Sequence, residues 1–149
     1  MPIYCDGRPC TASSLIENQI NSMVNKTGSA SVKGTIVRAS TTVDNAFETI
    51  IANGEEPIGI VFDNGIPDGS YCRIVTGGKA QVLLKNSTAS TRGNWVKVSD
   101  SAGRADATLT DPPGSGIPEH DQHFTEIGHC MESKTSGTDV LAWCMIHFN

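Results

Sequence analysis

The sequence predicts a mainly β protein, built as a compact β-sandwich or small barrel, and three observations lead to this prediction. Glycine makes up 15 of the 149 residues, above the roughly 7% that is average for proteins. Many of these glycines separate short runs rich in β-branched residues, a pattern typical of strands joined by tight turns. About seven such runs follow one another at the spacing seen in sandwiches and small barrels. A chain of 149 residues is expected to form a single domain.

The predicted strands begin shortly after residue 30. Residues 33–40 (KGTIVRAS) alternate in the manner of a strand, and residues 56–63 (EPIGIVFD) place Ile58, Ile60 and Phe62 on one parity. Residues 44–55 (DNAFETIIANGE) fit one face of a helix and also fit a strand, so both alternatives stay open.

The second half of the chain predicts strands that pair with their neighbours. Residues 69–85 contain two short strands around Gly77-Gly78, a pair suited to a turn that needs positive φ. Residues 93–108 contain a strand, a polar turn closed by Gly103 and a returning strand. Residues 124–133 and 138–149, joined by KTSG, predict a final hairpin.

Two regions depart from the β pattern, and they divide the chain into an arm of residues 1–30 and a β domain of residues 31–149. Residues 110–122 (TDPPGSGIPEHDQ) carry three prolines and two glycines, which predicts a long exposed loop. Within the arm, Ser14 and Glu17 have capping-box spacing, which favours a short helix over residues 13–28. The alternative is a loosely ordered tail.

The arm carries more apolar side chains than a solvated tail would. Burying one of them fully is worth about 1.5–3 kcal/mol, so they are expected to pack on the domain itself or on a partner. We expect an arm that reaches beyond its own domain. The candidate partner-binding residues are Ile3, Tyr4, Leu15, Ile16, Ile20 and Met23.

The C-terminal residues 140–148 are apolar at both strand parities. This pattern predicts a strand that is buried on both faces, or one that is shared between the core and a subunit interface. The candidate residues for this oligomer or core strand are Trp143, Met145 and Phe148.

Composition narrows the classes of partner. Lys and Arg total 11 against 16 Asp and Glu, a net charge of -5, which argues against a nucleic-acid partner. No apolar run has the length of a membrane span. The N-terminus has neither the basic start nor the apolar stretch of a signal peptide, so we expect the chain to be made in a cytoplasm.

The cysteines fit that compartment. Their number is odd and their spacing irregular, unlike a secreted disulfide framework, so free thiols are expected. The three C-terminal cysteines sit in apolar runs, where cysteine behaves as a small buried hydrophobe. The set is Cys5, Cys10, Cys72, Cys130 and Cys144.

Residues 119–130 (EHDQHFTEIGHC) raise the question of a metal site. Zinc needs four converging ligands on firm scaffolding, but His120 and His123 lie on or beside the proline-rich loop. His129 is separated from His123 by six residues, or roughly 20 Å of strand. We therefore predict no metal, and no cofactor, since no nucleotide or nucleophile motif is present. The chain is not expected to be an enzyme.

Taken in order, the runs SVKGTIV, EPIGIVFDNGIPDGSYCRIVTGGKAQV, GNWVKVSDSAGRADA, FTEIGHCMES and VLAWCMIHFN resemble the capsid decoration (cement) proteins of tailed bacteriophages. The likeness covers residues 32 to 149 and carries no catalytic residues with it.

The resemblance implies a β domain that binds the outside of an assembled capsid shell in the virion. The partners would be the major capsid protein and further copies of the chain, in a symmetric oligomer with a trimer favoured. Two other classes stay open. One is a glycan- or receptor-binding β module of a virion, and the other is a metal or thiol enzyme using residues 120–130.

Overall fold

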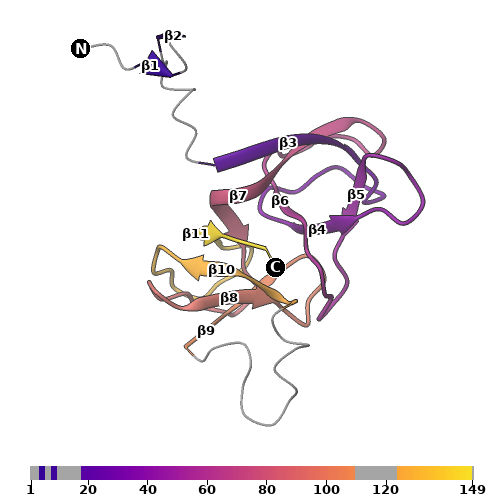
Figure 1. Ribbon diagram of the computed structural model, residues 1–149. Helices are drawn as coiled ribbons and strands as arrows, with labels where there is room; N and C mark the ends of the chain where they lie inside the picture. The colour runs from indigo at the N-terminus through magenta and orange to yellow at the C-terminus, as the bar shows by residue number, and fades with distance from the viewer. Residues whose placement is uncertain (1–3, 6–7, 10–17, 110–123, 149) are drawn as a thin grey trace.

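The computed structural model describes residues 4–5, 8–9, 18–109 and 124–148 (Figure 1). These residues form strands and connecting loops, with no helix among them, so the predicted mainly β fold is confirmed. The strands are β1 (Tyr4–Cys5), β2 (Arg8–Pro9), β3 (Asn18–Asn25), β4 (Ile36–Ala39), β5 (Ala46–Thr49), β6 (Gly59–Val61), β7 (Tyr71–Leu83), β8 (Trp95–Val98), β9 (Ala105–Thr108), β10 (Glu126–Cys130) and β11 (Leu141–Ile146). Within this described part, no helix is long and apolar enough to cross a membrane.

The first half of the domain is a closed five-stranded barrel. Its strands follow the order β3-β5-β4-β6-β7, and pairing of β3 with β7 closes the ring. Of the two folds that the sequence predicted, the small barrel is the one observed. The interior is apolar and well buried, with Met23 of β3 packed against it. Its residues are Val37, Phe47, Val61, Cys72 and Ile74.

The second half continues from the same long strand in the order β7-β11-β10-β8-β9 (Figure 1). A larger apolar cluster fills the space between this sheet and the outside of the barrel. Strands β4 and β6 of the barrel are therefore buried on both faces. In β4, Ile36 packs into the larger cluster while Val37 points into the barrel, and Ile60 and Val61 of β6 divide in the same way.

The predicted turn at Gly77-Gly78 is wrong, because β7 runs without a break through both glycines. Up to Gly78 the strand pairs with β3, and from Gly78 to Leu83 it pairs with β11. Gly78 has a φ of 86°, which glycine adopts without strain. The partner strand shifts register between Gln19 and Ile20 at this point. The glycine pair thus lets one strand bend from the barrel into the second sheet.

The predicted helix over residues 13–28 is also wrong for its described part, because residues 18–25 form β3. Seven residues of β3 pair with β7, among them Ile20 with Val75. Helix propensity is a weak preference that such tertiary pairing overrides. Residues 44–55, which fitted either element, contain the strand β5.

Both predicted C-terminal hairpins are confirmed. Strand β8 pairs with β9, and β10 pairs with β11, each antiparallel. The predicted loop over residues 110–122 lies outside the described residues.

Candidate functional site

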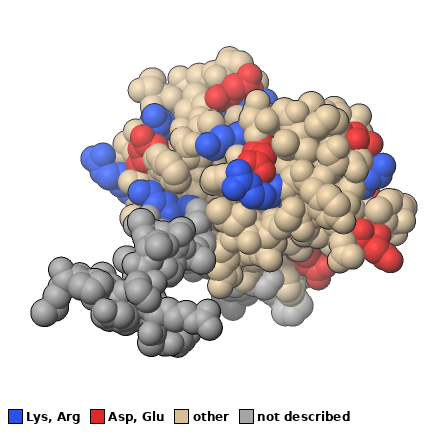
Figure 2. Space-filling model, turned by 90° about the horizontal axis from the view of Figure 1, so that it is seen from above, with Lys and Arg blue, Asp and Glu red and all other residues tan. Residues whose placement is uncertain are grey.

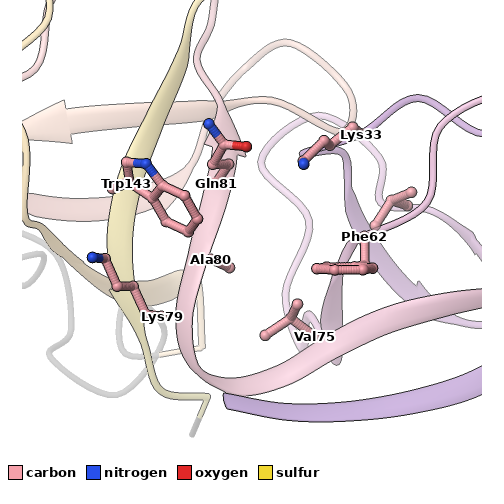
Figure 3. Close-up of a pocket in the computed structure, with 8 residues that line it drawn as sticks. Lys33, Phe62, Val75, Lys79, Ala80, Gln81 and Trp143 are labelled. Atoms are coloured by element: carbon pink, nitrogen blue, oxygen red, sulfur yellow. The ribbon is translucent and has the colours of Figure 1, made fainter. Parts of the chain in front are cut away.

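A small hollow lies where β7 bends away from the barrel, between β6 and β11. Figure 3 shows Trp143 of β11 on one side and Phe62, directly after β6, on the other, with residues of β7 between them. Strand β7 pairs with β6 before its bend and with β11 after it. Phe62, next to β6, and Trp143, on β11, therefore lie on opposite sides of the bend. We call this site the basic hollow. Its lining is Lys33, Val61, Phe62, Val75, Lys79, Ala80, Gln81 and Trp143.

The size of the basic hollow limits what it can hold. Its cavity volume is about 40 Å³, far below the roughly 300–1,000 Å³ of sites for small molecules and cofactors. One water needs about 10–15 Å³ of such space. The hollow therefore accommodates a few waters or one small apolar group of a partner, with Val61, Val75 and Ala80 beneath it.

Each aromatic ring of the hollow has a cationic side chain over its face. The Lys79 ammonium lies 4.9 Å from the centre of the Trp143 ring. The Phe62 ring has the Arg73 guanidinium at 4.8 Å and the Lys33 ammonium at 5.6 Å. Contacts of this kind are worth about 0.5–1 kcal/mol each at exposed sites. They hold the rings in place and put positive charge at the rim.

That charge is only partly neutralised within the protein. Arg73 donates two hydrogen bonds to the Asp63 carboxylate, at 2.9 and 2.7 Å, and this contact is the main cause of the lowered pKa of Asp63. Acidic and basic side chains lie side by side in the same way on the face shown in Figure 2. Lys33, in contrast, forms no ion pair with another described residue. The rim thus keeps positive charge on a protein of net charge -5.

Beside the hollow, the outward face of the second sheet carries a ladder of large side chains, which we call the outer face. Strand register places Lys79, Met145, His129 and Trp95 side by side across β7, β11, β10 and β8. The His129 and Trp95 rings are 4.2 Å apart. Tryptophan and methionine are enriched where proteins contact one another, so this face has the composition of a docking surface.

Trp143 and Met145 project from β11 onto this outer face, and they are 38% and 41% exposed. The core alternative is therefore wrong for these two residues, and the subunit-interface alternative stays a prediction. The backbone at Trp143 is held firmly, because its N–H donates to the Glu132 carboxylate at 3.1 Å. This hydrogen bond is the main cause of the lowered pKa of Glu132. Phe148 is half-buried and packs against the larger apolar cluster.

Three of the six candidate arm residues lie in the described part of the chain. Ile20 is exposed on β3, and Met23 packs against the barrel interior. Tyr4 lies in β1, which pairs with β2. Ile3, Leu15 and Ile16 lie outside the described residues, and the partner-binding role of the arm stays a prediction.

The two described histidines, His129 and His147, lie close together, with ring centroids 5.6 Å apart. His120 and His123 lie outside the described residues, while His147 Nε2 lies 3.3 Å from the Glu126 carboxylate. Across residues 18–109 and 124–148, no three potential ligands gather around a common point.

Cys72, Cys130 and Cys144 are free thiols, and all three are buried, which confirms the prediction that they behave as small buried hydrophobes. Cys5 lies in β1, and Cys10 lies outside the described residues.

Two solved structures of bacteriophage proteins share this fold. The N base of the phi29 head fiber protein gp8.5 superposes with a TM-score of 0.58 and 17% identity, over 87% of this chain and 95% of that one. A chain from the capsid of the Myoviridae phage XM1 superposes with a TM-score of 0.53 and 15% identity, over 91% and 87%. No protein-family model and no curated protein sequence matches the chain. The resemblance to capsid-associated phage proteins is thereby confirmed at the level of the fold.

Proposed function

We propose that this protein is a structural, non-enzymatic component of a phage virion that binds the outer surface of the assembled capsid. The observation that carries the proposal is the fold, which is shared over 87% of the chain with the base of a phage head fiber and over 91% with a phage capsid chain. The proposed partners are the major capsid protein and further copies of this chain, in a symmetric oligomer such as a trimer.

The proposed action is stabilisation by mass action. A protein that bridges neighbouring capsid subunits binds the assembled shell and not the separated subunits. A free concentration of 100 times the dissociation constant then stabilises the shell by about 2.7 kcal/mol at each site. Because a shell repeats the same site many times, a symmetric oligomer engages several of them together, which strengthens binding further.

We assign the contact with the shell to the outer face and the basic hollow. Binding energy concentrates in a few large side chains that leave water completely on docking, and tryptophan is enriched among them. Trp143 meets this description, since it is partly exposed and its backbone is fixed by Glu132. The positive charge of Lys33 at the rim suits an acidic capsid surface. The candidate arm residues that precede β3 would add a second contact.

The test is to mix the purified protein with expanded, undecorated capsids and image the shells by electron microscopy. Regular added density at equivalent lattice positions is expected for the wild type. Trp143→Ala should weaken the affinity for the shell at least tenfold, the effect of about 1.4 kcal/mol, as read from occupancy over a dilution series. Tyr71→Ala is the matched control, because Tyr71 is 70% exposed on the barrel half of β7.

Two failures of this experiment are distinguishable. Absence of any added density with the wild type contradicts capsid binding itself. Full binding by Trp143→Ala leaves capsid binding in place and shows that the outer face is the wrong surface.

A glycan- or receptor-binding module is the second candidate function. The observation that favours it is the exposed Trp143 ring next to the Gln81 amide, since sugars stack on aromatic rings and bond to amides. A glycan array probed with the wild type and with Trp143→Ala tests this candidate. Glycan signal that is retained by Trp143→Ala would rule out the ring as the sugar platform.

A further inference from the structure

Cys130 and Cys144 face each other across the β10–β11 hairpin. The two residues are register partners, and both side chains point into the larger apolar cluster. They are 1% and 0% exposed, so each thiol is enclosed by protein on every side.

The hydrogen-bond pattern shows which kind of pair they form. The N–H of Met131 donates to the Trp143 carbonyl at 2.8 Å, while the N–H of Cys130 points to the other side and donates to Asn94 at 2.8 Å. Cys130 and Cys144 are therefore a non-hydrogen-bonded pair of an antiparallel ladder. Such pairs bring their Cα atoms to about 4.5 Å, inside the window of about 4.4–6.8 Å in which a disulfide can form.

The two sulfurs already interact. Their interaction lowers the pKa of Cys130 and raises that of Cys144, and the Cys144 thiol donates a hydrogen bond to the Ala142 carbonyl at 3.6 Å.

We propose that Cys130 and Cys144 form a disulfide that locks the β10–β11 hairpin when the protein enters an oxidising medium. With a disulfide such as oxidised glutathione as oxidant, the Cys130 thiolate attacks one glutathione sulfur and releases the first glutathione thiolate. The Cys144 thiolate then attacks Sγ of Cys130 in this mixed disulfide and releases the second. The protein thiols lose two electrons and two protons, and the glutathione disulfide gains them.

Burial sets the rate of this reaction. An oxidant reaches the thiols only when the hairpin opens locally. Cross-linking is therefore slow in the folded protein and faster when the chain refolds with oxidant present. The bond closes a loop of about 15 residues, which corresponds to a rise in melting temperature of about 6–12 °C for a protein of this size.

The test refolds the protein with either oxidised glutathione or a reductant, blocks free thiols, and digests with trypsin without reduction. Lys134 lies between the two cysteines, so cleavage separates residues 105–134 from residues 135–149 unless the disulfide joins them. Each of these peptides contains one cysteine, and Cys5 and Cys10 fall in a different peptide. The joined peptide is expected from the oxidised sample alone, and it should separate on reduction.

Melting temperatures of the oxidised and reduced wild type measure the locking effect without any substitution. Cys72→Ala is the matched control, because Cys72 is equally buried but lies in the barrel interior. It should keep both the joined peptide and the rise in melting temperature, whereas Cys130→Ala should lose both. Separate, blocked peptides after oxidative refolding would overturn the disulfide. A joined peptide with an unchanged or lower melting temperature would overturn the locking role.

Discussion

Neighbouring residues of β11 should respond in opposite ways to truncation, because the strand has one buried and one open face. Ile146 is 4% exposed and belongs to the larger apolar cluster, whereas Met145 is 41% exposed on the outer face. Removing a buried isoleucine side chain costs about 2–5 kcal/mol, since the cavity adds to the lost transfer energy. An exposed position of this kind changes stability by about 0.5 kcal/mol or less.

Ile146→Ala should therefore lower the melting temperature by about 4–20 °C, at about 2–4 °C for each kcal/mol in a chain of this size. Met145→Ala should leave it within about 2 °C. Calorimetry of the two variants beside the wild type gives the comparison. Equal losses in the two variants would refute the reasoning, because Met145 would then be part of a packed core and the outer face would not be open for docking.

Three further predictions concern the barrel and its surroundings. Because Arg73 lowers the pKa of Asp63 below its ordinary value of 3.8, the pair stabilises the fold above that pH and its contribution is lost as pH falls through the lowered pKa. Asp63→Asn should lower stability at pH 7 and flatten the decline below about pH 4 in acid titrations of unfolding. Gly103→Ala should lower the free energy of unfolding, measured in urea, by at least about 2 kcal/mol. The φ of Gly103 is 71°, and the added Cβ would meet two threonine methyl carbons at 2.8 Å. A neutral result would contradict this close packing. Deleting residues 1–17 keeps β3 whole and should preserve a cooperative melting transition, whereas deleting residues 1–28 removes the strand that closes the barrel and should abolish it; identical melting of both deletions would show that β3 is dispensable.

Local signals explain what could be predicted about the fold. The hairpins β8–β9 and β10–β11 join strands that are close in sequence, and their turn residues mark the reversal. Strand β3 gave no such signal, since its main partner β7 lies about fifty residues further along the chain and spacing at Ser14 and Glu17 favoured a helix. The Gly77-Gly78 pair was misread because a bend within a strand and a turn between strands need the same positive φ.

The candidate site could be predicted only in part, because it is also formed by pairing between strands that are distant in sequence. Trp143 and Met145 stood out because β11 is apolar at both parities. Nothing in the sequence pointed to a site at Lys33 or Phe62. The pairing of β6 with β7 and of β7 with β11 brings Phe62 near Trp143, and the Gly34 N–H, which donates to the Val61 carbonyl, places Lys33 beside them. The positive charge at the hollow could not be predicted either, since a net charge of -5 describes the whole chain and not one of its surfaces.

The sharing of β7 between the two halves has a consequence for how the chain is made on the ribosome. All barrel strands lie within residues 18–83, so the barrel can close while the C-terminal residues are still being translated. Strand β11 ends at Ile146 and follows about 3–13 s later at the usual rate of about 5–20 residues per second. During that interval Ile36, Ile60 and Val75, which the completed protein covers, face the surrounding solution. The nascent chain is then most exposed to aggregation, and the interval ends only when its last strand arrives.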